Sequence, residues 1–340
     1  MAVCGPMKHL PFAAALGLVL ATPSLGEAPP KPAALAPSEI VAAAPKGDWV
    51  AIAPDDLLVM DLAPDYRGPS TGSGSRRVVI QLMPPPFSQG WVGNIRKLAA
   101  AHWWDGLSVN RVQDNYVVQW GDADGEDKAK ARKLPDGLAV VPENEYVAHT
   151  SSRSLCYQAF CPDLPSAITM WRTTIGDSTG LSTGFGAGWP LAAEDYIPGK
   201  ESDSVWPIHC YGMVGVGRNL TPDTGSGAEL YTVIGHAPRH LDRNIALVGR
   251  VIEGIENLSS LPRGTGALGF YEKAEERTGI VSVRLGNEVA GLPAYEYLST
   301  ESQAFARYAD ARANRRDAFF IRPAGGADIC NIPVPVRRVK

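Results

Sequence analysis

Hydrophobic and polar positions change in short runs along most of the chain, which predicts strands and turns rather than long helices. Residues 57–62 and 77–82 are rich in β-branched and apolar residues, and the segment between them is rich in Gly and Ser. Similar strand-like runs follow at residues 107–112, 115–121, 211–217, 229–235 and 244–252. The pattern therefore predicts a mainly β protein with many antiparallel strands and two or three helices.

Two segments have the spacing of an amphipathic helix instead. Ser88 is a candidate N-cap for a helix over about residues 89–102, where apolar residues recur on one face. Thr300 and Gln303 form a capping-box pattern at the start of a second helix, which extends to about residue 316. One side of this second helix is strongly basic, as expected for a solvated surface.

The N-terminal segment has the order of a secretory signal. Lys8 precedes an apolar run at residues 10–21, and small or helix-breaking residues follow as far as Gly26. We therefore expect residues 1–26 to be a cleaved signal peptide and the protein to be exported, either periplasmic or secreted. No stable membrane insertion is expected after cleavage, because the apolar run is too short to span a bilayer. Residues 27–46, rich in Pro and Ala, predict a semi-extended linker.

Composition and charge are those of a globular protein with no preference for nucleic acid. The 340 residues are 45% hydrophobic and 20% charged, with a formal net charge of −4. Removal of residues 1–26 takes away one lysine and changes this charge to −5. A nucleic-acid partner is not expected, because the sequence lacks a clustered positive footprint. We expect a monomer without a cofactor.

Four cysteines remain after the signal: Cys156, Cys161, Cys210 and Cys330. An even number in an exported chain permits two disulfides with three possible connectivities. The favoured interpretation is a local Cys156–Cys161 bond and a Cys210–Cys330 bond that ties the C-terminus to the main domain. The alternative is that the first two cysteines form half of a metal site. No metal is expected, because the chain has no second pair at such spacing.

The first block of sequence with a distinctive order of residues is 77–122. A strand leads through three prolines into the predicted helix, and Trp-Trp-Asp-Gly follows at 103–106. Next come Val-Asn-Arg-Val at 109–112 and Tyr-Val-Val-Gln-Trp-Gly-Asp at 116–122. The arginine and the glutamine of these last two motifs therefore belong to neighbouring predicted strands.

The second block covers residues 209–256. It contains a strand-like run at 209–217, Leu241 followed by Asp242, and a Gly-Arg-Val motif at 249–251. In order and spacing, the two blocks together resemble divergent cyclophilin-type peptidyl-prolyl cis-trans isomerases. This resemblance implies catalysis of X–Pro isomerisation in exported proteins, which assists their folding, with proline-containing polypeptides as partners.

The resemblance also implies an architecture. It predicts a closed antiparallel β-barrel with capping helices over residues 47–265. Residues 143–206 contain few periodic segments and are expected to be an insertion in this domain. Residues 266–340 are then expected to form a C-terminal extension that contains the second helix.

The implied chemistry centres on Arg111, which matches the family's catalytic arginine. Rotation about an X–Pro bond has a barrier of about 20 kcal/mol because amide resonance must be lost. A permanently charged arginine suits this reaction, since its fork of donors can stabilise the twisted amide. Gln119 matches the residue that binds the substrate backbone and positions the arginine. The expected pocket and substrate contacts are Tyr116, Val117, Thr232, His240 and Leu241.

Several positions of the second block depart from the family pattern. In this alignment, Thr232 replaces a pocket phenylalanine, and Leu230 replaces a glutamine that binds the substrate backbone. Ile245 replaces a wall histidine, and Arg218 replaces an asparagine that contacts substrate. These departures support a second hypothesis, a peptide-binding or scaffold protein that has kept the barrel but is a weak or inactive catalyst.

Each site residue also has an interpretation without function. Arg111 could pair with an acid across strands, Gln119 and Tyr116 could fill the interior of a barrel, and Leu241 could be plain core. Ser178 lies in a Gly-x-Ser-x-Gly pattern, but the strand and helix of a hydrolase nucleophile are not predicted around it.

Two further motifs read as turns or loops. His236 and His240 have a metal-like spacing, but Pro238 between them favours a turn. The Gly-x-Gly-x-x-Gly motif at residues 264–269 opens no convincing helix and is read as a loop.

Overall fold

The computed structural model describes residues 34–64, 76–151, 181–194 and 202–339. They belong to one compact unit, residues 34–340. The expected signal peptide, residues 1–26, lies outside the described residues, as do Cys156, Cys161 and Ser178. In the part of the chain that is described, no helix is long and apolar enough to cross a membrane.

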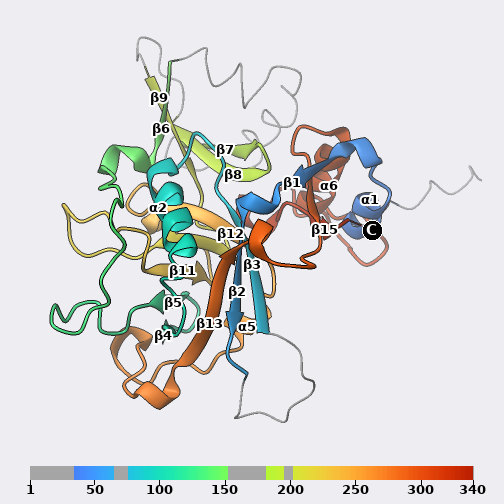
Figure 1. Ribbon diagram of the computed structural model, residues 1–340. Coiled ribbons are helices and arrows are strands. Elements are labelled where there is room, and N and C mark those ends of the chain that lie inside the picture. Colours follow the sequence, from blue (N-terminus) through green and yellow to red (C-terminus); the bar gives the residue numbers. More distant parts are fainter. Residues whose placement is uncertain (1–33, 65–75, 152–180, 195–201, 340) are drawn as a thin grey trace, which may run out of the picture. The chain divides into compact units, whose positions relative to one another are not determined.

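Eight antiparallel strands close a barrel, which confirms the predicted fold class (Figure 1). Their order around the barrel is β10-β11-β5-β4-β13-β2-β3-β12, and β12 pairs with β10 to close it. The strands are β2 (Leu57–Leu62), β3 (Arg76–Leu82), β4 (Ser108–Val112), β5 (Val117–Gly121), β10 (Met213–Val216), β11 (Leu230–Val233), β12 (Leu247–Glu253) and β13 (Thr278–Leu285). All but β13 were predicted from the sequence, most of them a few residues too long.

Strand β13 corrects the expected domain boundary. It pairs with β2 along most of its length and with β4 at its start, so the barrel cannot close without it. The boundary expected at residue 265 was therefore placed too early. The sequence signal was weak because the apolar residues of β13 do not simply alternate with polar ones. Ile280 and Val283 are buried, whereas Val281 is 58% exposed.

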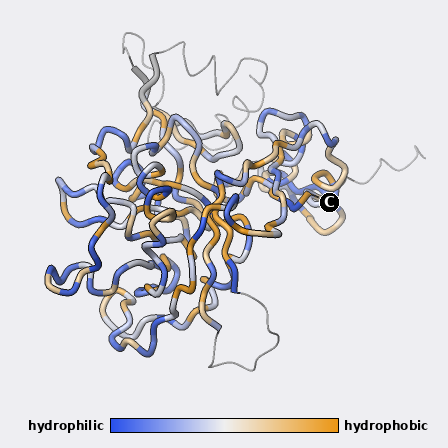
Figure 2. Tube along the Cα trace, viewed as in Figure 1, coloured by the Kyte–Doolittle hydropathy of each residue, from blue (hydrophilic) through white to orange (hydrophobic). Residues whose placement is uncertain are grey.

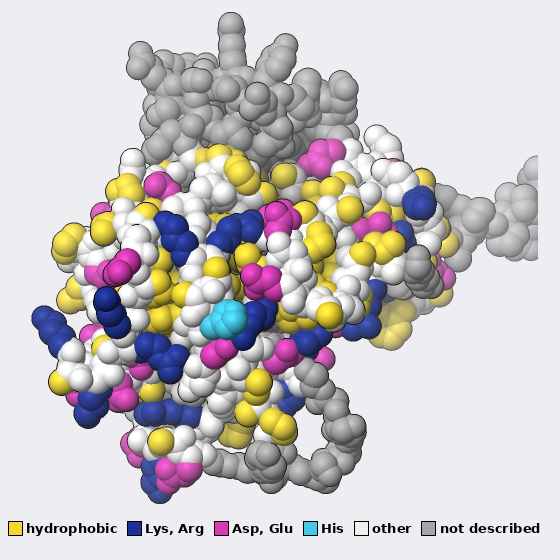
Figure 3. Space-filling model, in the orientation of Figure 1, with side chains coloured by type: hydrophobic (Ala, Val, Ile, Leu, Met, Phe, Trp, Pro, Cys, Tyr) yellow, Lys and Arg dark blue, Asp and Glu magenta, His cyan; other side chains and the backbone are white. Residues whose placement is uncertain are grey.

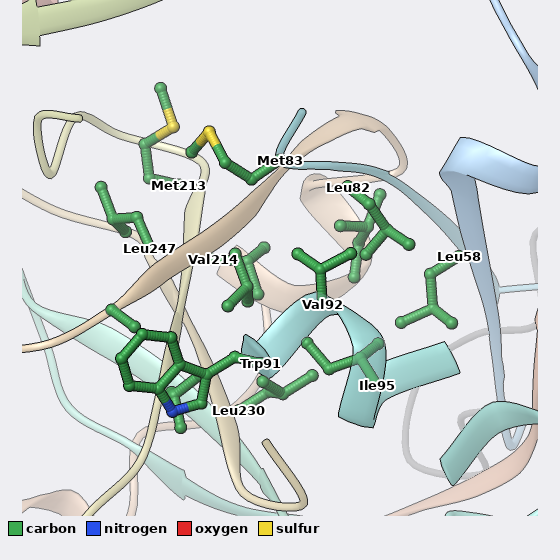
Figure 4. Close-up of a cluster of buried hydrophobic side chains, with 14 of the residues drawn as sticks. Leu58, Leu82, Met83, Trp91, Val92, Ile95, Met213, Val214, Leu230 and Leu247 are labelled. Atoms are coloured by element: carbon green, nitrogen blue, oxygen red, sulfur yellow. The ribbon is translucent and has the colours of Figure 1, made fainter. Parts of the chain in front are cut away.

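Helix α2 (Gln89–Ala100) covers the barrel and ends two residues earlier than expected. Its side chains Trp91, Val92 and Ile95 point toward residues of the barrel strands, among them Val214 and Leu230 (Figure 4). This contact is part of the main hydrophobic core, and Figure 2 shows that hydrophobic residues concentrate in the barrel strands while the outer loops are more hydrophilic. Burial of the apolar face thus holds the helix in place.

Ser88 occupies the N-cap position of α2, as predicted, but not with a capping side chain. Its backbone is left-handed (φ 54°), and its side chain makes no capping hydrogen bond to the helix. The Ser88 carbonyl instead accepts the first helical hydrogen bond, from Val92 N at 3.0 Å.

The expected insertion contains more regular structure than its sequence suggested. A four-stranded antiparallel sheet has the order β6-β9-β8-β7. Its strands are β6 (Ala148–Ser151), β7 (Leu181–Gly186), β8 (Trp189–Glu194) and β9 (Ser202–Pro207). Arg250 of the barrel donates to the Gly188 carbonyl at 2.6 Å, and its guanidinium lies 4.4 Å from the Trp189 ring centre. This sheet therefore packs on the barrel.

A three-stranded sheet, in the order β1-β14-β15, joins the two ends of the described chain. It consists of β1 (Trp49–Ile52), β14 (Tyr295–Leu298) and β15 (Val336–Arg338). Helix α1 (Pro37–Ala42) packs against α6 (Gln303–Ala313) beside it (Figure 1). The linker expected over residues 27–46 is thus helical in part, because Ile40 and Val41 bury apolar surface against the cluster around α6.

The cap of α6 is Ser302 rather than Thr300. The Ser302 side chain accepts a hydrogen bond from Phe305 N at 3.0 Å, so the N-cap lies two residues later than predicted. Cys210 and Cys330 form a disulfide across 120 residues of sequence, which confirms that expected pair.

The remaining helical elements are short. Helix α5 (Glu256–Ser259) follows β12. Single 3-10 turns occupy Lys46–Asp48, Pro54–Asp56, Glu143–Tyr146, Arg239–Leu241, Ala267–Gly269, Ala274–Glu276, Gly286–Glu288 and Ile329–Asn331. On the face shown in Figure 3, Lys and Arg side chains are interspersed with Asp and Glu.

Candidate active site

Arg111 and Gln119 lie opposite each other on neighbouring barrel strands. They are register partners in the β4–β5 pair, next to an irregularity between Val109 and Arg111. Arg111 Nη1 donates to Gln119 Oε1 at 3.3 Å. Among the described residues, Arg111 donates hydrogen bonds to two side-chain amides and to one backbone carbonyl. None of these acceptors is an acid, so the structure does not support the alternative in which Arg111 pairs with an acid across strands.

The Arg111 guanidinium is held between two aromatic rings. Its central carbon lies 5.6 Å from the centre of the Tyr116 ring and 5.3 Å from that of Phe270. Nε donates to the Leu268 carbonyl at 2.8 Å, and Nη2 donates to Gln113 Oε1. Burial lowers the pKa of the Arg111 guanidinium below its usual range. Three of its five N–H donors are thus used, and two have no acceptor among the described residues.

A small apolar cluster lies beside this arginine. Val117 of β5 and Tyr231 and Val233 of β11 are buried together, with Tyr116, Leu241 and Ile245 packed against them. These residues form a cluster separate from the main core of the barrel. The structure therefore brings together Tyr116, Val117 and Leu241, three of the residues that the sequence assigned to the pocket. His240 is exposed, and its ring stacks on Tyr116 with the centres 6.2 Å apart.

Thr232 faces away from the apolar cluster, so the sequence alignment was out of register by one residue at this strand. It pairs with Val118, a residue of the main core, and is fully buried. Neighbouring positions of a strand point to opposite faces, so the pocket face of β11 carries Tyr231. The alignment extended backward from Leu241 and Asp242, and it took no account of the loop between β11 and Leu241. An aromatic residue at 231 was the signal that could have corrected the register.

Tyr231 is fixed by a buried hydrogen-bond chain. Asp242 Oδ1 accepts from the His209 backbone N–H at 3.0 Å and lies 2.8 Å from Nδ1 of the same ring. Arg239 Nε donates to Asp242 Oδ2 at 2.6 Å. Burial lowers the pKa of His209, which favours the neutral ring. Because the carboxylate is an acceptor, we place the ring proton on Nδ1, so that Nε2 accepts from Tyr231 Oη at 2.8 Å.

Gly215 makes room for this tyrosine. A Cβ atom at position 215 would lie 2.3 Å from Cζ and Oη of Tyr231. The ring therefore occupies the space of an absent side chain on the neighbouring strand β10. The position of Tyr231 in the apolar cluster thus depends on a glycine, which has no side chain.

Glu229 is a site residue that sequence reasoning missed. Its Oε1 accepts from Asp122 N at 2.6 Å, and its carboxyl also hydrogen-bonds the side chain of Gln119. Burial raises the pKa of Glu229 to about 8. Gly121 permits this position, since a Cβ there would lie 2.1 Å from Glu229 Oε1, and its φ of 153° favours glycine. Glu229 is a single acidic residue directly before β11 and belongs to no sequence motif, so the sequence carried no signal for it.

The segment before Glu229 is held by hydrogen bonds from helix α2 and from the turn that follows this helix. Trp91 Nε1 donates to the carbonyls of Thr224 and Gly225, and Trp104 Nε1 donates to that of Ala228 at 2.8 Å. Large buried indoles that also satisfy backbone carbonyls fix this segment firmly.

A cavity of about 690 Å³ adjoins these residues. Arg111 and Gln119 lie on its wall together with Glu229, Arg218 and Phe270. Arg218 donates to the Asn244 and Asn219 carbonyls at 3.0 and 2.7 Å, so its side chain is directed by the loops around the cavity. The arrangement places a cationic fork between an apolar cluster and a cavity.

Comparisons with known proteins show the family of this chain. A family model described as cyclophilin type peptidyl-prolyl cis-trans isomerase/CLD matches residues 75–284. The chain belongs to this family. A search of curated proteins finds no match. The family match ends within β13, which agrees with a barrel domain that extends beyond residue 265.

Two solved cyclophilin structures illustrate the similarity. Cyclophilin AquaCyp293 from Hirschia baltica superimposes with a TM-score of 0.60 at 20% identity, covering 86% of this chain and 94% of that one. A cyclophilin-type isomerase from Cryptosporidium parvum, solved in the presence of the dipeptide Ala-Pro, gives a TM-score of 0.34 at 8% identity, covering 62% and 92%. At this identity, the first likeness supports the barrel fold.

Proposed function

We propose that this cyclophilin catalyses cis–trans isomerisation of X–Pro bonds in exported polypeptides and thereby assists their folding. The observation that carries the proposal is the pairing of Arg111 with Gln119 beside the apolar cluster around Tyr231. An isomerase of this kind needs no nucleophile, because the reaction breaks amide resonance and no covalent bond.

The proposed roles follow from the positions of the side chains. The cluster of Val117, Tyr231 and Leu241 receives the proline ring, with Tyr116 at its edge next to Arg111. The free donors of Arg111 bind the amide as it twists, and Gln119 holds the guanidinium in place while it binds the substrate backbone. Stabilisation of the twisted amide over the planar one is what accelerates rotation.

Two features support action on exported proteins. The N-terminal residues have the order of a secretory signal, and the Cys210–Cys330 disulfide is of a kind that persists in oxidising compartments. We therefore propose that the protein works outside the cytoplasm, as a monomer, on clients whose folding is limited by proline isomerisation. Fractionation of the source cells tests the location, and an intact protein in the cytoplasm would contradict it.

The activity is tested by NMR exchange on tetrapeptides that contain one X–Pro bond. The purified protein, without residues 1–26, is expected to broaden or exchange the cis and trans signals far beyond the uncatalysed rate. Binding of the same peptides is measured in parallel. Absence of exchange on a broad panel of X–Pro peptides would overturn the proposal.

A second candidate function is peptide binding without catalysis. It is favoured by the occupied donors of Arg111, since Leu268 and Gln113 already accept from two of its nitrogens. Peptide affinity without exchange in the experiment above is the result that would support it.

A further inference from the structure

We propose that Glu229 is a positioning residue of the isomerase site, whose carboxyl group orients the Gln119 amide and, through it, the Arg111 guanidinium. The inference rests on the proposed isomerase function and adds to it a residue that can be switched by protonation. Glu229 is not expected to touch the reacting bond, so it acts through its neighbours.

Gln119 lies between Arg111 and Glu229 and contacts both of them. Arg111 Nη1 donates to Gln119 Oε1, and the Gln119 side chain is hydrogen-bonded to the Glu229 carboxyl. The other end of that carboxyl is anchored by the Asp122 backbone N–H. Because an amide has its acceptor and its donors on opposite sides, the partner of Nε2 decides where Oε1 points.

The carboxyl group is built into the fold rather than left at its surface. Gly121 leaves the space that Oε1 of Glu229 occupies. Trp104 fixes Ala228, the residue directly before Glu229. A flexible surface glutamate would not require a glycine opposite it and an indole hydrogen bond beside it.

The two protonation states of Glu229 act differently on Gln119. The ionised carboxylate only accepts, so it selects the Gln119 rotamer with the amide N–H toward Glu229 and Oε1 toward Arg111. The protonated acid can donate to Oε1, which allows the amide to flip. A flipped amide would present N–H groups to the guanidinium and lose the anchor of Arg111.

Ionisation of Glu229 falls within an accessible pH range. Burial, together with the charges of Asp122 and Glu126, raises its pKa to about 8. The charged side chains that line the same cavity are Arg111, Asp122, Glu126, Arg132, Arg218, Asp223 and Arg277. Four arginines face three acids besides Glu229, so the charges of the cavity balance once Glu229 ionises.

The test is the pH profile of kcat/KM, measured by NMR exchange on an uncharged X–Pro peptide between pH 6.5 and 9.5. The wild-type protein should gain activity by several-fold as Glu229 ionises, with a midpoint near 8. E229Q keeps the shape of the side chain but cannot ionise, so its profile should be flat. A step that persists in E229Q, or a flat wild-type profile, would overturn the proposal.

A matched control changes a neighbouring acid of the same cavity. Glu126 accepts from Asn219 Nδ2 at 3.1 Å and contributes to the raised pKa of Glu229. E126Q should therefore keep the step and move it to lower pH. Loss of the step in E126Q would show that Glu126, and not Glu229, is the group whose ionisation changes the activity.

A second readout does not depend on activity. The Gln119 side-chain amide signals, assigned by their loss in Q119E, should shift with pH in the wild-type protein and stay constant in E229Q. If the wild-type protein catalyses no exchange, the proposed function fails, while this titration still decides whether Glu229 orients Gln119. Signals that do not move with pH would contradict this role of Glu229.

Discussion

At the scale of single residues, the site is defined by side chains that hold other side chains. Arg111 is oriented by Gln119 and Gln113, and Tyr231 is oriented by His209. The sequence predicted Arg111 and Gln119 because they belong to a compact motif on two adjacent strands. It could not predict His209, because this residue lies 22 positions before Tyr231 and meets it only when β10 and β11 pair.

Tyr231→Phe tests the buried hydrogen-bond chain. The change keeps the pocket ring but leaves His209 Nε2 without its donor, and a buried polar group without a partner costs about 1–3 kcal/mol. We expect the free energy of unfolding to fall by about this amount, measured by urea denaturation. Tyr211→Phe, at a position that is 51% exposed, is the control and should change little. Equal stability of Y231F and wild type would show that the chain contributes nothing.

At the scale of secondary-structure elements, register decides which residues reach the site. Apolar periodicity located seven of the barrel strands, but it could not fix the faces of β11. A shift of one residue exchanges Thr232, which faces the core, for Tyr231, which faces the pocket. Strand β13 escaped prediction because its apolar residues do not alternate with polar ones: Ile280 and Val283 are buried, whereas Val281 is exposed.

Gly215→Ala tests the contact between β10 and β11. The new Cβ would overlap the Tyr231 ring, which belongs to the apolar cluster, so we expect kcat/KM to fall by about tenfold to a hundredfold. Gly93→Ala on α2 is the matched control, since nothing lies within 4 Å of its Cβ position. It should keep its activity and gain about 0.5–1 kcal/mol in unfolding free energy. Unchanged activity of G215A would contradict the assigned pocket.

At the scale of the whole molecule, the sequence predicted the barrel and the long disulfide but not how the chain ends are built. Residues before β2 and after β14 form one sheet, which no local pattern could reveal. The insertion likewise became a sheet whose strands pair across segments of low periodicity.

The Cys210–Cys330 disulfide should stabilise this arrangement. It closes a loop of 120 residues, and removal of a native disulfide typically costs about 2–5 kcal/mol. We expect the double variant C210A/C330A to unfold at a lower urea concentration, with unchanged isomerase activity in native buffer. Identical unfolding midpoints for the variant and the oxidised wild type would contradict a stabilising role.

The most direct measurement for the whole account is the kcat/KM of Arg111 variants in the NMR exchange assay. R111A should lose about a hundredfold to a thousandfold in kcat/KM, as expected when a preorganised donor to the transition state is removed. R111K keeps the charge but not the planar fork, and should recover little. Arg263, an exposed arginine paired with Asp114, provides the control R263A, which should behave as wild type. Equal activity of R111A and wild type would contradict the central claim that Arg111 is the catalytic residue.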